Sequence, residues 1–268
     1  MAVKLIALDI DGTLIPPNRY GEAEHLPSKR VKAAIHRVQE AGIAVILASG
    51  RMFPGTAAIA RHLELDGWLI CQQGCGVHTI SGDLLHEFPI DHERAMQIIE
   101  YAKSLDRAYE WFNPLRYIAS RQSHHTDDYA RVSGVEAEYH PQPERSGLRP
   151  TGVGIISSAD EAPAIHRALA AHHGEELHLL DFPEVTVASA PEANKGHALS
   201  LVCADLGIDR GDTVAVGDSV NDAAMLAWAG RGIALAHSDR YALDAADEVL
   251  DDDAEPLARF LESLVSNG

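Results

Sequence analysis

Cysteine is scarce in this chain of 268 residues, and long apolar runs are missing. The three cysteines, Cys71, Cys75 and Cys203, are an odd number, so we expect no disulfide framework and a reducing, cytoplasmic location. No second Cys or His pair near Cys71 and Cys75 completes a zinc set. No apolar run reaches the roughly 18 residues of a membrane helix, and the first residues lead into an apolar strand instead of a signal peptide.

Positive charge is also scarce. Against 40 acidic residues the chain has 22 basic ones, only five of them lysine, and its formal net charge is −18. Nucleic acids and anionic membranes bind basic surfaces, so this balance disfavours both as partners. With 46% hydrophobic and 23% charged residues the composition is that of a globular protein. The length allows one large or two ordinary domains.

The first and last thirds of the chain alternate continuous apolar runs with helical patterns. One helix is predicted from Pro27-Ser28 to Gly42, and others begin at about Pro54 and at Lys195. Continuous apolar strands between helices favour a parallel sheet that is covered on both faces. The predicted strands are Val3–Leu8, Ile43–Leu47, Trp68–Cys71, Thr213–Val216 and Gly232–Leu235.

The middle third has a different pattern. Val77–Ile80 and Leu84–Phe88 flank Ser81-Gly82-Asp83, which predicts a hairpin, and further short strands and two helices indicate an antiparallel α+β unit. Residues 121–150 are polar, and we predict no element there. The sequence therefore predicts an α/β protein. A Rossmann-like parallel-sheet core, residues 1–81 and 190–268, carries an inserted α+β domain, residues 82–189.

Two carboxylates, Asp9 and Asp11, follow the first apolar strand. Carboxylates at the end of a buried strand are costly unless something pairs with them. Alternation directs both side chains to the same side, and Gly12 with Thr13 lets the backbone turn and offer N–H groups to an anion. This pattern predicts a nucleophile beside an acid/base, with a divalent metal between protein and phosphate.

Three further polar motifs stand at strand ends or at a helix start. Ligands of parallel sheets bind at the carboxyl ends of the strands, so we expect all the motifs to converge there. They are Ala48-Ser49-Gly50-Arg51, Asn194-Lys195-Gly196 and Gly217-Asp218-Ser219-Val220-Asn221-Asp222.

Together with Asp9-Ile10-Asp11-Gly12-Thr13, these motifs resemble those of the haloacid dehalogenase superfamily of aspartate-nucleophile phosphotransferases. The resemblance covers the whole chain and is strongest to the Cof-like sugar-phosphatase branch, whose cap domain is inserted between the second and third motifs. It implies a Mg²⁺-dependent phosphomonoester hydrolase that acts through an aspartyl-phosphate. The implied substrate is a small phosphorylated metabolite, either a sugar phosphate or a phosphoglycolate-like acid.

The resemblance also implies roles for individual residues. Asp9 is the expected nucleophile and Asp11 the general acid and then base. Asp9, Asp11 (through its backbone carbonyl) and Asp218 are the expected metal ligands, and hard oxygen ligands favour Mg²⁺. The expected phosphate-binding residues are Gly12, Ser49, Gly50, Lys195 and Asn221, with Arg51 and Asp222 in support.

Several of these side chains have simpler roles open to them. Ser49, Asn221 and Asp222 can each cap the helix that follows. Arg51 either pairs with a carboxylate or contacts substrate. Relatives carry Asn-Gly-Ala where this chain has Gln72-Gln73-Gly74-Cys75-Gly76, and Gln73 offers its amide one methylene farther out. We expect exposed histidines at four positions and candidate cap contacts at three arginines: His124, His125, His172, His173, Arg116, Arg121 and Arg149.

Two other functions stay open at this point. A phosphosugar mutase on the same scaffold would transfer phosphate within a sugar and release none. A non-catalytic protein would bind a phosphometabolite without turnover. Both a monomer and a homodimer are compatible with the sequence.

Overall fold

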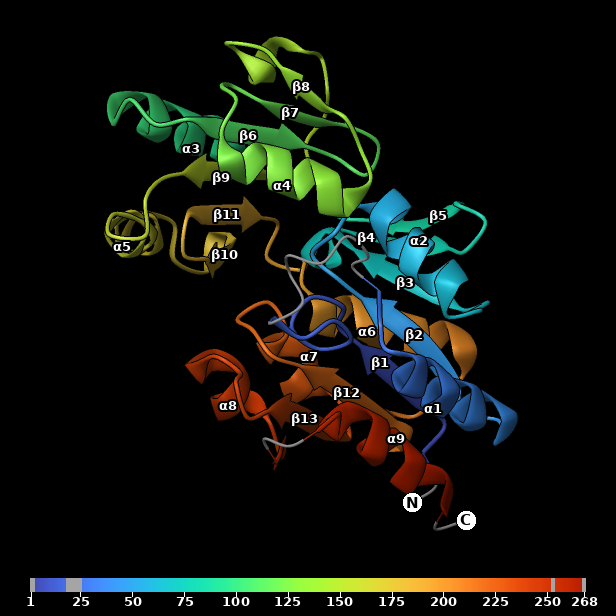
Figure 1. Cartoon of the computed structure of the whole chain (residues 1–268). Helices are drawn as coiled ribbons and strands as arrows, with labels where there is room; N and C mark the ends of the chain where they lie inside the picture. The colour runs from blue at the N-terminus through green and yellow to red at the C-terminus, as the bar shows by residue number, and fades with distance from the viewer. Residues whose placement is uncertain (1–2, 18–25, 252–253, 267–268) are drawn as a thin grey trace.

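The computed structural model describes residues 3–17, 26–251 and 254–266. Within them the chain forms two β-sheets that occupy separate halves of the molecule (Figure 1). The larger sheet is built from the first and last parts of the sequence, and the smaller one from the middle part. This arrangement confirms the predicted α/β class, with a parallel-sheet core and an inserted α+β unit.

The larger sheet has eight strands in the order β14-β13-β12-β1-β2-β3-β4-β5. Neighbouring strands from β14 to β3 are parallel, whereas β4 and β5 are antiparallel to their neighbours. The strands are β1 (Leu5–Leu8), β2 (Ala44–Ala48), β3 (Trp68–Cys71), β4 (Gly76–Thr79), β5 (Leu84–Glu87), β12 (Thr213–Gly217), β13 (Arg231–Leu235) and β14 (Glu248–Leu250).

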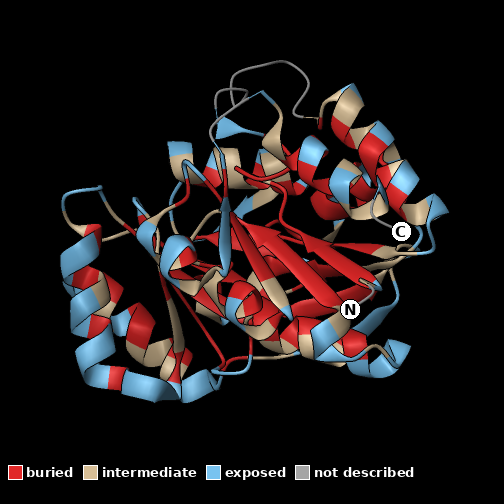
Figure 2. Ribbon diagram, turned by 90° about the horizontal axis from the view of Figure 1, so that it is seen from below, coloured by how far each residue is buried: buried red, intermediate tan, exposed pale blue. Residues whose placement is uncertain are grey.

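Helices cover both faces of the larger sheet, and the strands between them are buried (Figure 2). Strand β1 shows why, because successive residues point to opposite faces. Ile6 and Leu8 join one apolar cluster, and Leu5 and Ala7 join the other. The first cluster includes α1 (Lys29–Glu40), α2 (Phe53–His62) and α9 (Pro256–Ser266), and the second α6 (Lys195–Leu206), α7 (Ala223–Trp228) and α8 (Arg240–Ala245).

The smaller sheet has six strands in the order β10-β11-β9-β6-β7-β8, antiparallel except for the β7–β8 pair. Helices α3 (His92–Ser104) and α5 (Ala162–His173) pack on one face, and α4 (His124–Ser133) packs on the other. The strands are β6 (Tyr109–Phe112), β7 (Tyr117–Ala119), β8 (Ala137–Tyr139), β9 (Gly152–Ile156), β10 (His178–Asp181) and β11 (Val185–Ser189).

The predicted hairpin forms, but both of its strands belong to the larger sheet, where β4 pairs with β3. The predicted boundary between residues 81 and 82 therefore falls inside this hairpin. Because β5 completes the edge of the larger sheet, we propose that the inserted unit begins after Glu87.

Some elements were not predicted. The polar segment 121–150 contains α4 and β8, and the last third contains α8 and β14. Helix α4 has a weak apolar pattern, but Ser123 and Thr126 form a capping box at its start and Gly134 ends it in the left-handed conformation. No helix within the described ranges is long and apolar enough to cross a membrane.

Helix α4 of the inserted unit rests directly on α2 of the core. The contact is close because Gly55 has no side chain: a Cβ there would lie 2.2 Å from the carbonyl oxygen of Val132. The Ser133 hydroxyl accepts a hydrogen bond from the backbone N–H of Met52 (3.2 Å), at the start of α2. This contact holds the inserted unit over the carboxyl ends of the core strands.

We expect Gly55→Ala to separate α4 from α2. Alanine stabilises a helix by about 1 kcal/mol relative to glycine, so the substitution does not weaken α2 itself. A loss of protection in α4 therefore reflects the lost contact between the two helices. Amide hydrogen exchange in α4 is expected to rise about tenfold, equivalent to about 1.4 kcal/mol. The control is Ala58→Ser on the exposed side of α2. Equal exchange in α4 of both variants would contradict the assigned contact.

Candidate active site

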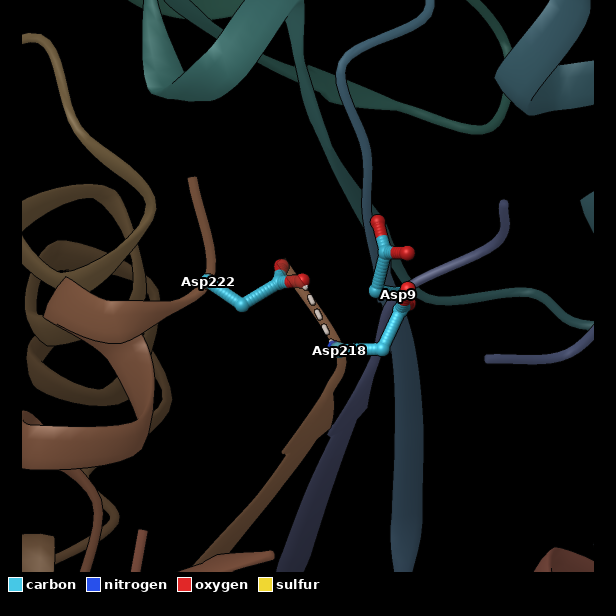
Figure 3. Close-up of side chains that lie close together, drawn as sticks. All are labelled: Asp9, Asp218 and Asp222. Carbon is cyan, nitrogen blue, oxygen red and sulfur yellow. Dashed lines mark hydrogen bonds between the residues drawn. The ribbon is translucent and has the colours of Figure 1, made fainter. Parts of the chain in front are cut away.

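The sequence motifs meet at the carboxyl edge of the larger sheet. Strands β1, β2 and β12 are adjacent, and the motif residues follow directly on their last residues. Figure 3 shows Asp9, Asp218 and Asp222 close together at this edge. One oxygen from each of the three carboxylates lies within 4.8 Å of the others.

Lys195 joins two of these carboxylates. Its Nζ lies 2.6 Å from Asp9 Oδ1 and 2.6 Å from Asp222 Oδ1. The Lys195 side chain is fully buried, at 0% exposure. Asn194 places it there by capping α6, since its side chain accepts from the backbone N–H of His197. A buried ammonium requires such partners, because an unpaired charge inside a protein is strongly unfavourable.

Asp222 fixes the loop after β12. Its Oδ2 accepts from the backbone N–H groups of Asp218 and Ser219, both at 3.0 Å, while Oδ1 receives Lys195. With both oxygens engaged inside the protein, Asp222 orients Lys195 and the loop that carries Asp218. Its supporting role in catalysis stays a prediction.

Asp218 lies directly over Gly12. A Cβ at residue 12 would fall 2.0 Å from Asp218 Oδ2, and the backbone φ there is +96°, so glycine is required on both counts. Thr13 donates its hydroxyl to Asp218 Oδ1 at 2.8 Å. The backbone N–H of Gly12 is donated to the carbonyl of Ile15 at 2.8 Å, so it does not face a ligand as expected. The structure shows instead that the absence of a side chain at Gly12 leaves space for the Asp218 carboxylate.

Charge in this cluster is unbalanced. Three carboxylates and one ammonium leave −3 + 1 = −2 among the described residues of the cluster. Burial, together with the nearby Asp222 carboxylate, raises the pKa of Asp9 well above its usual range, although Lys195 opposes this. Burial and Asp222 likewise raise the pKa of Asp218 to about 7. Burial alone would lower the pKa of Lys195, but Asp222 and Asp9 raise it.

The donor set fits a divalent cation. Asp9 Oδ2 and Asp218 Oδ2 accept no hydrogen bond from any described residue, and their partner oxygens are held by Lys195 and Thr13. Carboxylate oxygens with space for water are the ligands that Mg²⁺ prefers. A doubly charged ion would also cancel the net charge of the cluster.

Arg51 and Asp11 form a second ion pair beside the first. The guanidinium contacts both carboxylate oxygens, at 2.7 Å from Nε and 2.5 Å from Nη2. Of the two roles left open for Arg51, the structure displays the carboxylate pair. Ser49 is buried and accepts the backbone N–H of Arg51 at 3.1 Å, which leaves its hydroxyl hydrogen free to donate.

Asn221 contacts the residue that departs from the family pattern. Its Nδ2 donates to Gln73 Oε1, and its Oδ1 accepts from Ser219 at 2.6 Å. Gln73 has φ of +63° and lies against Gly50, where a Cβ would be 2.5 Å from Gln73 Nε2. The longer side chain is therefore accommodated by Gly50 and tied to Asn221.

The structure adds residues that the sequence did not single out. His237 Nε2 lies 2.8 Å from the carbonyl oxygen of Gly12, and it comes from the end of β13, a strand end that carries no recognised motif. A cavity beside Gln73 is lined by Glu110, another such residue, and by His125, which the sequence predicts to be exposed. Glu110 sits in an apolar strand of the inserted unit, and its contacts depend on tertiary packing.

Two of the four histidines expected to be exposed are not. His125 keeps 20% of its side chain exposed because it pairs with Glu110, and His173 is buried beside His172 in α5. His124 and His172 are exposed as expected. None of the three arginines considered as cap contacts lines the cavity. Arg116 pairs with Glu138, Arg121 pairs with Asp106, and Arg149 is exposed.

Comparisons with known proteins identify the family of this chain. Residues 6–261 match the family model of the haloacid dehalogenase-like hydrolases. The chain is 28% identical over 291 residues to phosphatase YwpJ of Bacillus subtilis, spanning 98% of this chain and 100% of that protein. It is 26% identical over 240 residues to the HMP-PP phosphatase of Cronobacter sakazakii, spanning 88% and 85%.

Solved structures resemble the fold over nearly its whole length. A haloacid dehalogenase-like hydrolase from B. subtilis superposes with a TM-score of 0.82 at 25% identity, covering 97% of this chain and 99% of that one. One from Bacteroides thetaiotaomicron superposes with a TM-score of 0.81 at 22% identity, covering 98% and 99%.

The chain therefore belongs to the haloacid dehalogenase-like hydrolases. This confirms the family and the Cof-like branch that the motifs predicted. The protein is a phosphatase of this family, with small phosphorylated substrates.

We expect Lys195→Met to destabilise the fold strongly. The substitution keeps most of the volume but leaves Asp9 and Asp222 buried without their cation, which costs about 3–5 kcal/mol in comparable sites. Urea unfolding measures the loss. Lys4→Met is the matched control, since Lys4 pairs with Asp212 at the surface and 55% of its side chain is exposed. A Lys195 variant as stable as the control would contradict the assigned role of the buried pairs.

Proposed function

We propose that this protein is a Mg²⁺-dependent phosphomonoester hydrolase that forms an aspartyl-phosphate on Asp9. The observation that supports the proposal is that the two oxygens of the Asp9 carboxylate have different hydrogen-bond partners. One oxygen is fixed by the fully buried Lys195, and the other accepts no hydrogen bond within the described residues. It stands beside Asp218 at a site that fits a divalent cation.

In the first half-reaction one carboxylate oxygen of Asp9 attacks phosphorus, the bond to the leaving oxygen breaks, and Asp11 supplies a proton to that oxygen. In the second half-reaction Asp11 takes a proton from water, which attacks the aspartyl-phosphate and releases inorganic phosphate and free Asp9. Arg51 contacts both oxygens of Asp11 in this structure, so this pair has to open for Asp11 to carry the transferred proton.

Asp9 and Asp218 would hold Mg²⁺ with the backbone carbonyl of Asp11. When bound, the metal neutralises charge between the anionic nucleophile and the anionic phosphate. Lys195 and the Ser49 hydroxyl supply further positive charge and hydrogen bonding to the phosphate oxygens. Asn221 and Gly50 border the same space through Gln73.

The substrate is proposed as a small phosphorylated metabolite that reaches the site under the inserted unit. Tyr129 of α4 donates its hydroxyl to the carbonyl of Gly50 at 3.3 Å, which shows how close the unit lies to the phosphate-binding motif. Closure of such a unit excludes bulk water. Sugar phosphates and phosphoglycolate-like acids were expected from the resemblance alone. The residues that line the cavity are the better guide to the leaving group.

We expect Asp9→Asn to lower the rate of phosphate release from acetyl phosphate by on the order of 10³-fold or more, because the amide cannot act as the nucleophile. The fold should persist, since the change removes one charge from a cluster of net negative charge. An enzyme-coupled phosphate assay at neutral pH, under which acetyl phosphate is not broken down by acid, and a thermal melt measure the two effects. Asp66→Asn, at an exposed position outside the site, is the control. Release by Asp9→Asn at the control rate would refute the aspartyl-phosphate, and absence of release by the native chain would favour a mutase or a binding protein.

Mg²⁺ should stabilise the protein and be required for turnover. At 100 times its dissociation constant a ligand adds about 2.7 kcal/mol, which corresponds to a rise in Tm on the order of 5–10 °C here. Excess chelator should reverse the rise and stop phosphate release. Asp218→Asn should abolish most of the rise, whereas Asp66→Asn should keep it. A Tm that does not respond to Mg²⁺, together with release that persists in chelator, would contradict the metal site.

A further inference from the structure

A cavity of about 410 Å³ lies between the smaller sheet, α4 and the Gln72-Gln73 turn of the core. It adjoins the phosphate site, because Gln73 lines it and also accepts the amide of Asn221. Tyr129, another lining residue, reaches the carbonyl of Gly50. A phosphomonoester bound at Asp9 therefore extends its leaving group toward this cavity.

The walls are mainly apolar and aromatic. Phe112, Tyr129 and Phe182 supply rings, and Val185 with Val187 supplies an aliphatic floor from β11. Such surfaces favour a flat ring, which buries apolar area on both faces and stacks against aromatic side chains.

One buried carboxylate stands in this apolar setting. Glu110 is 3% exposed. Its Oε1 accepts from Tyr117 Oη at 2.7 Å and lies 2.7 Å from His125 Nε2. Its Oε2 accepts no hydrogen bond from any described residue. Gly154, opposite on β9, leaves space for the group, since a Cβ there would lie 2.7 Å from Oε2. Glu110 lines the cavity, so a hydrogen-bond donor on a ligand there can reach this oxygen, and an ionised carboxylate in an apolar cavity favours such a donor.

The cavity offers little to a second anion. Among the described lining residues none is lysine or arginine, and Glu184 adds another carboxylate at the rim. A leaving group with its own carboxylate or phosphate would meet Glu110 and Glu184, while His125, which lines the same cavity, is already paired with Glu110; this disfavours binding.

We propose that Glu110 selects the leaving group, and that the preferred substrate is a phosphomonoester of a ring-bearing alcohol with a nitrogen donor, neutral or cationic. This inference rests on the proposed phosphatase function. It replaces the phosphoglycolate-like acid with a substrate whose far end donates to Glu110 Oε2 and whose ring lies between the aromatic walls.

The test is a series of benzyl phosphates that differ only at the para position, which carries –CH₂NH₃⁺, –CH₂OH or –COO⁻. The three compounds share the phosphate, the ring and the reacting bond. Differences in kcat/KM therefore measure how the cavity interacts with the para group. We expect the aminomethyl compound to exceed the carboxylate by at least about 100-fold, equivalent to about 2.7 kcal/mol. The corresponding alcohols, used as product inhibitors, should bind in the same order.

Glu110→Gln should reduce the preference for aminomethyl over carboxylate at least tenfold, chiefly through KM. Glutamine keeps the acceptor for Tyr117 and removes the charge. Glu138→Gln on β8 makes the same change on the same sheet, at an exposed position outside the cavity, and should keep the native preference. If Glu110→Gln does not fold, the inhibition series on the native chain decides.

The outcomes separate this inference from the proposed function. Acetyl phosphate has a leaving group too small to fill the cavity, so its hydrolysis tests the core chemistry alone. Hydrolysis of acetyl phosphate with equal kcat/KM across the benzyl series would overturn the role of Glu110 and leave the phosphatase standing. A preference that survives in Glu110→Gln would overturn the role as well. No hydrolysis of any compound, with equal binding of the three alcohols in calorimetry, would overturn both.

Discussion

The buried contact of Lys195 with Asp9 and Asp222 is the interaction on which the site depends. The ammonium group pairs with two carboxylates that are buried at the carboxyl ends of the parallel strands. Burial of either carboxylate without a partner would be strongly unfavourable. One lysine is not enough to neutralise them together with Asp218, and burial, together with the nearby Asp222 carboxylate, raises the pKa of Asp9 and of Asp218. A divalent cation, as proposed for this site, would offset the excess negative charge and allow an anionic phosphate to approach.

The two sheets supply different groups to the site and to the cavity beside it. The larger sheet supplies the charged groups from strand ends that are fixed by parallel pairing, so their spacing is rigid. The smaller sheet supplies an apolar cavity and one buried carboxylate, Glu110. The two are joined where Gln73 meets Asn221 and where α4 rests on Gly55. In the proposed mechanism the larger sheet carries out phosphoryl transfer and the smaller sheet selects the leaving group.

Much of the core could be predicted because its signals are local. Continuous apolar runs gave the strands, Ser28 and Asn194 marked helix starts, and motifs at strand ends pointed to one edge of the sheet. Helix α4 was not predicted because it lacks a clear apolar stripe. Its caps and its packing against the smaller sheet stabilise it instead. The hairpin β4–β5 was predicted as local structure, but its membership in the larger sheet depends on a distant edge, β3.

By itself the sequence determined the family, the fold class and the residue types of the catalytic motifs, since these are written in short segments whose spacing is fixed by strands and helices. Only the tertiary structure decided which side-chain and backbone groups contact one another at the site. It paired Arg51 with Asp11, turned the Gly12 N–H to Ile15 and brought Glu110 and His125 to one cavity. Such contacts join residues far apart in the chain, and no local propensity encodes them, because they arise only when separate elements pack.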